Sequence, residues 1–497
     1  MAERSLTLAG MVEVLREAGL SPDIQAPEDT RVTGVAHDSR RVRPGDVFVA
    51  WRGAAADGHA FVADALARGA AAVVAERPLD DCPVPLFVVR DGRLAAALLA
   101  DAVHGSPWRT LFTAAVTGTN GKTTTALLAR HVLGARGPAA ALGTLGVVGP
   151  DGGVRPGTAG LTTPGPVDTA AALAALRDEG VRSVVLEASS HALDQRRLDA
   201  LRFDAVAFTN LTHDHLDYHG DPAAYFDSKA RLLELLAVDG TCVVNLDDPA
   251  WEPLRTPRGR TLTYGLRVSA DLHGRIVEAC PHGTRVELSH AGGRAEVRLP
   301  LAGRFNVENA LAAAGIGLAA GIGLDAVAER LSDAPPVPGR LQVVVSEPFT
   351  VVVDFAHTPD ALGRVLETLR PLARGRLIVV FGAGGDRDPA KRPEMGRVAE
   401  EAADLVVVTS DNPRSEDPEA ILDDIVAGME RAPAARLADR REAIAHALGL
   451  ARAGDVVLLA GKGHETYQVL GERRLPFDEP AIVRELLGLV PQTESAP

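Results

Sequence analysis

The sequence predicts an α/β protein of three domains, and three observations lead to this fold class. The chain has 497 residues, which is more than one hydrophobic core usually serves. Hydrophobic residues make up 46% and aromatic residues only 4%, a composition typical of globular α/β proteins. Short apolar runs alternate with helical stretches in three successive sets. We therefore expect a small N-terminal α/β domain, a doubly wound central domain with a small antiparallel addition, and a Rossmann-like C-terminal domain.

The N-terminal domain is predicted to span residues 1–105. Apolar runs at Val47–Ala50, Ala71–Ala75 and Leu86–Val89 are expected to be strands, with alanine-rich helices between them. The turn-forming run that begins at His104 and ends at Pro107 follows these elements and marks the end of the domain.

The central domain is predicted to span residues 106–335. Its buried strands, each followed by a helical pattern, are expected at Leu111–Val116, Ser183–Leu186, Ala205–Phe208 and Thr241–Asn245. Between Thr261 and Leu301 the pattern changes to alternating strands with glycine turns, which predicts the antiparallel addition. A long alanine-rich helix is expected after Asn306.

The C-terminal domain is predicted to span residues 336–497, after a turn-rich linker at Asp333–Gly339. A third set of parallel strands is expected at Val351–Val353, Leu377–Phe381, Leu405–Thr409 and Val456–Ala460. The last residues, Gln492–Pro497, are polar and are expected to fray.

Composition excludes several classes of protein. A net charge of -14 argues against a nucleic-acid partner. The three cysteines, Cys82, Cys242 and Cys280, are far apart and odd in number, so neither a disulfide framework nor a cysteine metal site is indicated. No apolar run approaches the roughly 18 residues of a membrane-spanning helix, and no export signal is evident. These features predict a cytoplasmic protein without membrane insertion.

Lysine usage points to the chemistry. Only four of the 52 basic residues are lysines, and all four lie in motif-like segments: Lys122, Lys229, Lys391 and Lys462. A bias that turns lysine into arginine wherever a surface cation suffices would spare lysine where a compact amine is required. Chance retention in loops is the simpler explanation for any one of them, but it is less convincing for all four.

The run Thr117-Gly-Thr-Asn-Gly-Lys-Thr-Thr124 follows a predicted strand and opens a predicted helix. In this context backbone amides and a helix N-terminus cradle phosphates. We expect Lys122 to reach the terminal phosphates of a nucleotide and Thr123 to offer its hydroxyl to Mg2+. The spacing is two residues shorter than the standard Walker motif. The predicted nucleotide-binding residues here are Gly118, Thr119, Asn120, Gly121, Lys122, Thr123 and Thr124.

Two further polar clusters follow the next strands. Glu187 opens one cluster, and His213 lies in the other, Asn210-Leu-Thr-His-Asp-His-Leu-Asp-Tyr-His219. Ligands bind at the carboxyl ends of parallel strands, so Glu187 and His213 are candidate magnesium ligands. A zinc hydrolase is the alternative, but in such enzymes the last histidine is next to the aspartate, and here Tyr218 intervenes.

Lys229 lies ten residues after His219, at the start of a predicted helix. A solvated helix lysine is the simple interpretation. The functional alternative is a lysine carboxylated by CO2, which requires a desolvated, neutral amine that arginine cannot supply.

Together these motifs resemble the Mur ligases of peptidoglycan synthesis. The resemblance rests on the phosphate loop, Leu186-Glu-Ala-Ser-Ser-His191, the run at 210–219, Gly303-Arg-Phe-Asn-Val-Glu-Asn309 and Val353-Asp-Phe-Ala-His-Thr-Pro-Asp360, and it covers all three domains. Asp411-Asn-Pro-Arg414 and Gly461-Lys-Gly-His-Glu465 are similar to the members that add diaminopimelate, whereas lysine-adding members differ at the first of these.

The resemblance implies an ATP-dependent amide ligase. ATP would phosphorylate a carboxylate, because a carboxylate is a poor electrophile, and an amine would attack the acyl phosphate. The implied substrates are UDP-N-acetylmuramoyl-L-alanyl-D-glutamate, activated at the γ-carboxylate of D-Glu, and diaminopimelate. The N-terminal domain would bind the UDP end, the central P-loop domain ATP, and the C-terminal domain the amino acid. Domain closure would exclude water from the acyl phosphate.

Residue roles follow from the same resemblance. Catalytic roles fall on Lys122, Glu187, His213 and carbamylated Lys229, and the implied magnesium ligands are Thr123, Glu187, His213 and Lys229. Further nucleotide contacts are implied for Asn309, Asp354 and His357. The UDP-sugar peptide would be held by Ser39, Thr162, Thr163, Ser189, Gln195 and Arg197. The amino acid would be held by Arg387, Asp411, Asn412, Pro413, Arg414, Gly461 and Glu465.

Within this last set, Arg414 is suited to the distal carboxylate and Glu465 to the distal ammonium of diaminopimelate. Lys391 and Lys462 receive no role. The alternatives are a lysine-adding ligase, a folylpolyglutamate-type ligase, which the Asp38-Ser-Arg40 motif of the N-terminal domain disfavours, and a non-catalytic nucleotide-binding regulator. The sequence does not distinguish meso- from LL-diaminopimelate. We expect a monomer.

Overall fold

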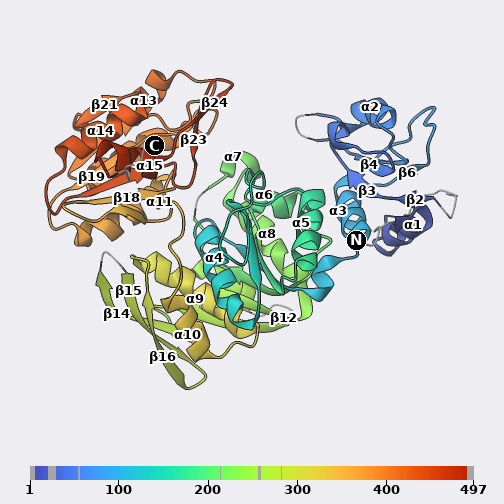
Figure 1. Cartoon of the computed structure of the whole chain (residues 1–497), viewed down its shortest axis with the longest axis horizontal. Coiled ribbons are helices and arrows are strands. Elements are labelled where there is room, and N and C mark those ends of the chain that lie inside the picture. The colour runs from blue at the N-terminus through green and yellow to red at the C-terminus, as the bar shows by residue number, and fades with distance from the viewer. Residues whose placement is uncertain are drawn as a thin grey trace, which may run out of the picture. The chain divides into compact units, whose positions relative to one another are not determined.

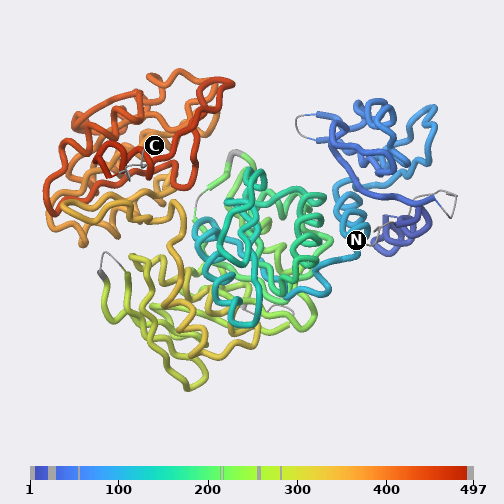
Figure 2. The backbone as a smooth tube through the Cα atoms, in the orientation of Figure 1, coloured from blue at the N-terminus to red at the C-terminus, as the bar shows by residue number. Residues whose placement is uncertain are grey.

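The computed structural model describes residues 6–20, 30–53, 56–212, 214–255, 259–280 and 283–489. The chain forms two compact units. The first comprises residues 1–273, 290–293 and 311–330, and the second comprises residues 274–289, 294–310 and 331–497. Figures 1 and 2 trace the chain from the N-terminal strands in blue, through the central sheet in cyan and green, to the C-terminal strands and helices in orange and red.

The N-terminal part of the first unit is built on a four-stranded parallel sheet in the order β3-β4-β5-β6. Its strands are β3 (Gly34–Ala36), β4 (Asp46–Ala50), β5 (Ala72–Ala75) and β6 (Leu86–Val88), with helices α1 (Leu8–Glu17), α2 (Val62–Ala67) and α3 (Gly92–Val103). A separate short pair joins β1 (Leu6–Thr7) to β2 (Arg31–Val32). Helix α1 begins where Thr7 accepts a hydrogen bond from the Gly10 N–H, and it buries one apolar face.

The central part of the first unit is a mostly parallel sheet in the order β13-β12-β11-β7-β10-β8-β9. Its strands are β7 (Phe112–Thr117), β8 (Ala139–Gly143), β9 (Gly146–Val148), β10 (Ser183–Glu187), β11 (Phe203–Phe208), β12 (Leu236–Asn245) and β13 (Arg260–Gly265). Only the β8–β9 pair is antiparallel among these neighbours. The helices are α4 (Lys122–Leu133), α5 (Pro166–Asp178), α6 (Ser190–Asp194), α7 (Leu216–His219) and α8 (Pro222–Ala230). The central strands are buried along their length, as expected for a sheet covered on both faces.

Between residues 274 and 330, successive segments of the chain belong alternately to the second and the first unit. Strands β14 (Leu272–Cys280), β15 (Gly283–His290) and β16 (Gly293–Leu299) are neighbours in sheet order, and they occupy the stretch predicted to hold glycine-punctuated strands. The start of β14 pairs with β13 in parallel, Tyr264 opposite Leu272. Helix α9 (Arg304–Ala319) is the predicted alanine-rich helix, and α10 (Leu324–Ser332) follows it.

The second unit is built on a six-stranded sheet in the order β17-β18-β22-β19-β20-β21. Its strands are β17 (Gln342–Val345), β18 (Thr350–Asp354), β19 (Leu377–Phe381), β20 (Leu405–Thr409), β21 (Ala435–Leu437) and β22 (Val456–Ala460). All neighbours are parallel except β17 and β18. The helices are α11 (Pro359–Leu369), α12 (Lys391–Ala402), α13 (Pro418–Val426), α14 (Arg440–Leu450) and α15 (Glu479–Leu486), and a hairpin joins β23 (Tyr467–Leu470) to β24 (Arg473–Pro476).

Short 3-10 helices complete the structure at Ser39–Arg41, Gly58–Phe61, Pro107–Thr110, Gly134–Arg136, Arg231–Leu235, Pro249–Arg255 and Arg370–Leu372. Every strand predicted from an apolar run is present within a few residues. The prediction omitted β8, whose alanines and glycine carry little strand signal. It also omitted the short strands β1, β2, β3, β9, β17, β21, β23 and β24. Within the described residues no helix has the length and apolar character needed to cross a bilayer.

Candidate active site

The predicted phosphate loop connects β7 to α4, which begins at Lys122. Gly118 has a φ of +145°, and a Cβ there would lie 1.9 Å from Thr209 Oγ1. Gly121 has a φ of +86°, in the left-handed region that favours glycine. Both glycines are therefore required by the backbone. The strand–loop–helix order places the first N–H groups of α4 at the loop, an arrangement that binds phosphate.

Asn210, after β11, holds this loop in shape. Its side-chain oxygen accepts from the Asn120 N–H at 2.9 Å, and its backbone oxygen accepts from the Thr119 N–H at 2.7 Å. Its amide nitrogen also donates to the Asn120 carbonyl at 3.2 Å. The motif that contains Asn210 was singled out from sequence, but no role was predicted for this residue. Its function is to fix the loop before a ligand arrives.

Lys122 lies over the loop that it follows. Its Nζ donates to the carbonyls of Gly118 at 2.8 Å and Thr119 at 2.9 Å. A flexible ammonium in this position can turn from carbonyl oxygens to phosphate oxygens without a change in the backbone.

Glu187, at the end of β10, gathers oxygen donors beside the first turn of α4. The hydroxyls of Thr123 and Thr144 each donate to Glu187 Oε2 at 3.0 Å, and the Thr144 N–H donates to Oε1 at 2.8 Å. Gly143 makes this possible, because a Cβ there would lie 2.1 Å from Oε1. Carboxylate and hydroxyl oxygens are the ligands that Mg2+ prefers, so the residues present fit that ion.

A third predicted metal ligand, His213, lies outside the described residues. Within the part of the chain that the structure describes, no group of three or more histidine, cysteine, aspartate or glutamate side chains is placed to hold a metal ion. His215 packs edge-on to the His191 ring at 4.8 Å between centroids, and burial lowers the pKa of His215 to about 4. His215 is therefore a neutral ring that packs against His191.

Lys229, on α8, is almost wholly buried, with 1% of its surface exposed. Its Nζ donates to the Gly118 carbonyl at 2.8 Å and lies 4.5 Å from the centre of the Tyr225 ring. Burial, and then the charge of Lys122, hold the pKa of the Lys229 amine well below its ordinary value, while Asp214 opposes this weakly. Burial therefore favours the uncharged amine beside the phosphate loop, which is the form that can react with CO2.

A second polar cluster adjoins Glu187. Thr163 Oγ1 donates to the Glu187 carbonyl at 2.7 Å and accepts from the Ser189 N–H at 3.0 Å. Arg197 donates to the Thr163 carbonyl at 2.8 Å and to Gln195 Oε1 at 2.7 Å. Thr162 lies next to Thr144, with 3.4 Å between their hydroxyl oxygens. The structure thus brings together five of the six residues predicted to hold the UDP-sugar peptide.

The sixth, Ser39, lies in the N-terminal part of the first unit, at the start of the Ser39–Arg41 turn. Ser39 is buried, and Asp38 caps the turn by accepting from the Arg40 N–H at 3.0 Å. His37 beside it stacks on Trp51 with 5.3 Å between ring centroids.

In the second unit, the two predicted amino-acid motifs meet. Asp411 and Asn412 follow β20, Glu465 follows β22, and Asn412 Nδ2 donates to Glu465 Oε2 at 2.8 Å. Pro413 and Gly461 are buried in the same two loops. Arg414 has a φ of +54°, and its N–H donates to the Val469 carbonyl at 3.1 Å.

The predicted carboxylate ligand Arg387 is exposed, and its guanidinium reaches the Asp386 carbonyl at 3.4 Å. The predicted nucleotide ligands of this unit have internal partners. Asp354 accepts from the N–H groups of Leu341 at 2.7 Å and Ala356 at 2.8 Å, and burial raises the pKa of its carboxyl. These roles stay predictions.

Asn309 donates to Asn306 Oδ1 at 3.3 Å, and His357 Nδ1 lies 2.8 Å from the Phe355 carbonyl. Sequence reasoning missed two residues. Thr144 lies in no recognised motif. Arg440, on α14, is buried at the carboxyl ends of β20 and β22.

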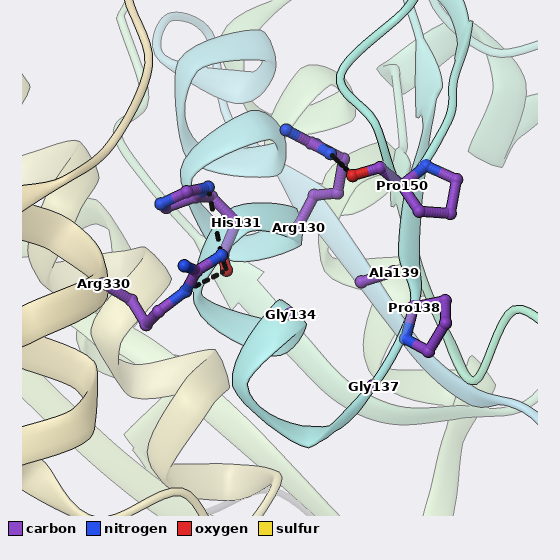
Figure 3. A pocket seen from close by; sticks show the side chains of 8 residues that line it. All are labelled: Arg130, His131, Gly134, Gly137, Pro138, Ala139, Pro150 and Arg330. Atoms are coloured by element: carbon purple, nitrogen blue, oxygen red, sulfur yellow. Dashed lines mark hydrogen bonds between the residues drawn. The ribbon is translucent and has the colours of Figure 1, made fainter.

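A cavity of about 330 Å³ lies elsewhere in the first unit (Figure 3). Arg130, His131 and Arg330 line it, and Arg330 Nη2 donates to the His131 carbonyl at 3.0 Å. The cavity is at the carboxyl end of the 12-residue helix α4, whereas Lys122 is at its amino end. The helix separates the two by roughly 18 Å. The cavity also adjoins the amino end of β8, opposite the edge where α/β proteins bind ligands.

Three family models match the sequence. They are described as Mur ligase family, catalytic domain, over residues 31–99; Mur ligase middle domain, over residues 116–317; and Mur ligase, glutamate ligase domain, over residues 339–463. Together they cover parts of all three predicted domains. The domain boundaries themselves stay predictions.

Whole-chain comparisons agree with these models. The UDP-N-acetylmuramoyl-L-alanyl-D-glutamate–2,6-diaminopimelate ligase of Gloeobacter violaceus is 45% identical, with 96% of this chain and 97% of the relative covered. A solved structure of a ligase with that same name is 35% identical and has a TM-score of 0.68, with 97% and 99% of the chains covered. The MurF ligase of Thermotoga maritima, solved in complex with ADP, shares the fold at 20% identity and a TM-score of 0.62, with 92% and 96% covered.

Proposed function

Because this chain belongs to the Mur ligase family, we propose that it joins diaminopimelate to the D-Glu γ-carboxylate of UDP-N-acetylmuramoyl-L-alanyl-D-glutamate at the expense of ATP. The identity of 45% over 96% of the chain to a relative named for these substrates supports the choice of both. The observation that carries the ligase chemistry is the convergence of the phosphate loop, Glu187 and the buried amine of Lys229 at one edge of the central sheet.

In the proposed reaction, the γ-carboxylate oxygen attacks the γ-phosphorus of ATP, and ADP leaves. The amine of diaminopimelate then attacks the carbonyl carbon of the acyl phosphate, loses a proton, and displaces phosphate. The loop N–H groups and Lys122 would hold the negative phosphates of ATP. Magnesium would supply further charge neutralisation when bound, with Thr123 and Glu187 among its ligands.

Lys229 is proposed to act as a carbamate. Its neutral amine would attack CO2, form a carbon–nitrogen bond and release a proton, so a buried amine becomes an anionic oxygen ligand. The buried position of the amine beside the Gly118 carbonyl of the phosphate loop supports this, since burial favours the neutral form that reacts with CO2.

The second unit is proposed to bind the amino acid. Arg414 can pair with the distal carboxylate and Glu465 with the distal ammonium, groups that diaminopimelate carries together. L-Lysine lacks the distal carboxylate and would leave Arg414 without its counter-charge.

A phosphate-release assay tests the proposal. Purified protein should release phosphate from ATP only when both UDP-dipeptide and diaminopimelate are present. Competition among meso-diaminopimelate, LL-diaminopimelate and L-lysine should rank lysine last. Phosphate release that needs neither substrate would overturn the ligase assignment.

Arg414→Ala should raise the KM for diaminopimelate far more than the KM for ATP. Arg397→Ala is the matched control, because Arg397 is an exposed arginine paired with Glu401 four residues later on α12. An equal rise in both KM values would contradict the role given to Arg414.

We also propose that the enzyme is a monomer of the cytoplasm. Cys82 and Cys242 are free thiols, which suits a reducing compartment. Size-exclusion chromatography with light scattering tests the first statement, and fractionation of cells tests the second.

A further inference from the structure

We infer that Lys462 is a positioning residue of the amino-acid site, which holds Asn412 and Glu465 in the orientation that receives the distal end of diaminopimelate. The inference deepens the proposed function and rests on it. Lys462 is wholly buried in the second unit, between the loops that follow β20 and β22.

The contacts of Lys462 link both motifs. Its Nζ donates to Asn412 Oδ1 at 3.1 Å and to Glu465 Oε2 at 3.1 Å, and it lies 3.5 Å from Asp411 Oδ1. Asn412 completes a triangle by donating from Nδ2 to the same Glu465 oxygen. The lysine and the Val469 N–H, which donates to the same Asn412 oxygen at 2.9 Å, together determine which way the Asn412 amide faces.

This triangle leaves one oxygen of Glu465 for a ligand. Oε2 is occupied by Lys462 and Asn412, whereas Oε1 has the Tyr467 hydroxyl at 3.4 Å. Burial, and then the charge of Glu465, raise the pKa of Tyr467, while the charge of Arg474, which lies 3.5 Å from the centre of the Tyr467 ring, opposes this more than that of Arg414 does. The Tyr467 hydroxyl thus contacts the carboxylate proposed to receive the distal ammonium.

Lys462 offsets the negative charge at the place where the two loops meet. Asp411 and Glu465 form ion pairs with Lys462, which leaves one net negative charge among the three. Arg414 supplies one positive charge. The distal end of diaminopimelate also carries one charge of each sign, which Glu465 and Arg414 can each meet. Without Lys462, two carboxylates would face a ligand that itself brings a carboxylate.

A second buried cation, Arg440, donates hydrogen bonds to the backbone at the start of both loops. Arg440 donates to the Ser410 carbonyl at 3.1 Å and the Ala460 carbonyl at 2.8 Å, and it pairs with Glu479 at 2.7 Å. Ser410 and Ala460 immediately precede the two motifs. Arg440 fixes the backbones of the two loops, which leaves Lys462 to set their side chains.

Arginine could not replace Lys462. The three acceptors surround a single point, Nζ, in a wholly buried place. A planar guanidinium spreads five donors over a larger volume and would be overpacked there. This accounts for a lysine in a chain whose basic residues are mostly arginine.

The test compares Lys462→Met with the wild type. Methionine has a similar length and no charge. The KM for diaminopimelate should rise roughly 10- to 100-fold, the effect of losing hydrogen bonds to a charged group, while the KM for ATP stays within about twofold. An unchanged KM for diaminopimelate, or an equal rise for both substrates, would overturn the inference.

Loss of a buried cation can also prevent folding. Lys462→Met/Asp411→Asn removes the ion pair as a unit and is therefore better tolerated. Its KM for diaminopimelate should exceed that of Asp411→Asn alone, and equal values would refute the positioning role. Failure of the proposed function is seen separately, because the wild type would then show no diaminopimelate-dependent phosphate release.

Discussion

Lys229 and Lys462 are both buried lysines, yet their surroundings are opposite. In the first unit, Lys229 donates to a neutral carbonyl, lies over an aromatic ring, and has the charge of Lys122 nearby. In the second unit, Lys462 forms ion pairs with Asp411 and Glu465. Burial alone therefore does not decide whether an amine carries charge; the partners supplied by the fold decide it.

The difference explains why arginine replaced neither residue. At Lys229 the requirement is a group that can lose its proton, and a guanidinium cannot do so in a protein. At Lys462 the requirement is a compact cation among three acceptors. One residue type thus meets two unrelated needs, reactivity in one unit and positioning in the other.

The largest expected effect is on activity. Lys229→Arg should lower kcat by at least roughly 100-fold, because a guanidinium cannot form a carbamate and adds charge beside Lys122. The measurement is diaminopimelate-dependent phosphate release. Arg397→Lys, an exchange in the opposite direction at an exposed site, serves as the control and should keep full activity. Retention of more than a tenth of the activity by Lys229→Arg would remove the reason given for this lysine.

The second effect is on stability. Lys462→Met should lower the free energy of unfolding by about 3 kcal/mol, because it leaves the carboxylates of Asp411 and Glu465 without a counter-charge. Urea denaturation measures the change. Adding Asp411→Asn should recover part of the loss. Additive losses in the double variant would show that the two residues do not interact, and the contrast with Lys229 would then fail.

The third effect has the opposite sign. Lys229→Met should raise the free energy of unfolding by about 2 kcal/mol, since an apolar side chain of similar length replaces a buried amine that gives up its proton to fold. The experiment needs CO2-free buffer, because a carbamate formed only in the native state would stabilise the wild type. A less stable Lys229→Met variant under these conditions would place Lys229 in the same class as Lys462.

Local patterns explain how much of this could be predicted. The phosphate loop is contiguous in sequence, so its strand, glycines and helix start could all be assigned before the structure. The strands β19, β20 and β22 were predicted to the residue, because their apolar runs end at turn residues. Strand β8 was not, because its alanines are as common in helices.

Contacts between distant residues could not be read from local patterns. Lys229 lies 111 residues from Gly118, and Lys462 lies 51 residues from Asp411. Sequence motifs marked both lysines, and only the family resemblance gave a role to the first. Thr144 and Arg440 act through side-chain contacts to Glu187 and to two carbonyls, which no spacing rule announces. The helices and strands could be predicted from local sequence patterns, whereas the site depends on contacts between strand ends that are far apart in the sequence.

The smallest effect, and the most direct reading of the protonation of Lys229, is the pH dependence of stability. The pKa of this amine is depressed in the folded state from an ordinary lysine value of 10.5. Between the two pKa values the unfolded chain binds one proton more than the native protein, so stability rises with pH by at most about 1.4 kcal/mol per unit. In CO2-free buffer, the stability advantage of Lys229→Met over wild type should therefore shrink as pH rises toward 10.5. Taking the difference between the two proteins cancels every other group that titrates alike in both. A difference that stays flat, or that grows with pH, would mean that Lys229 keeps its proton on folding, and the two buried lysines would then be alike.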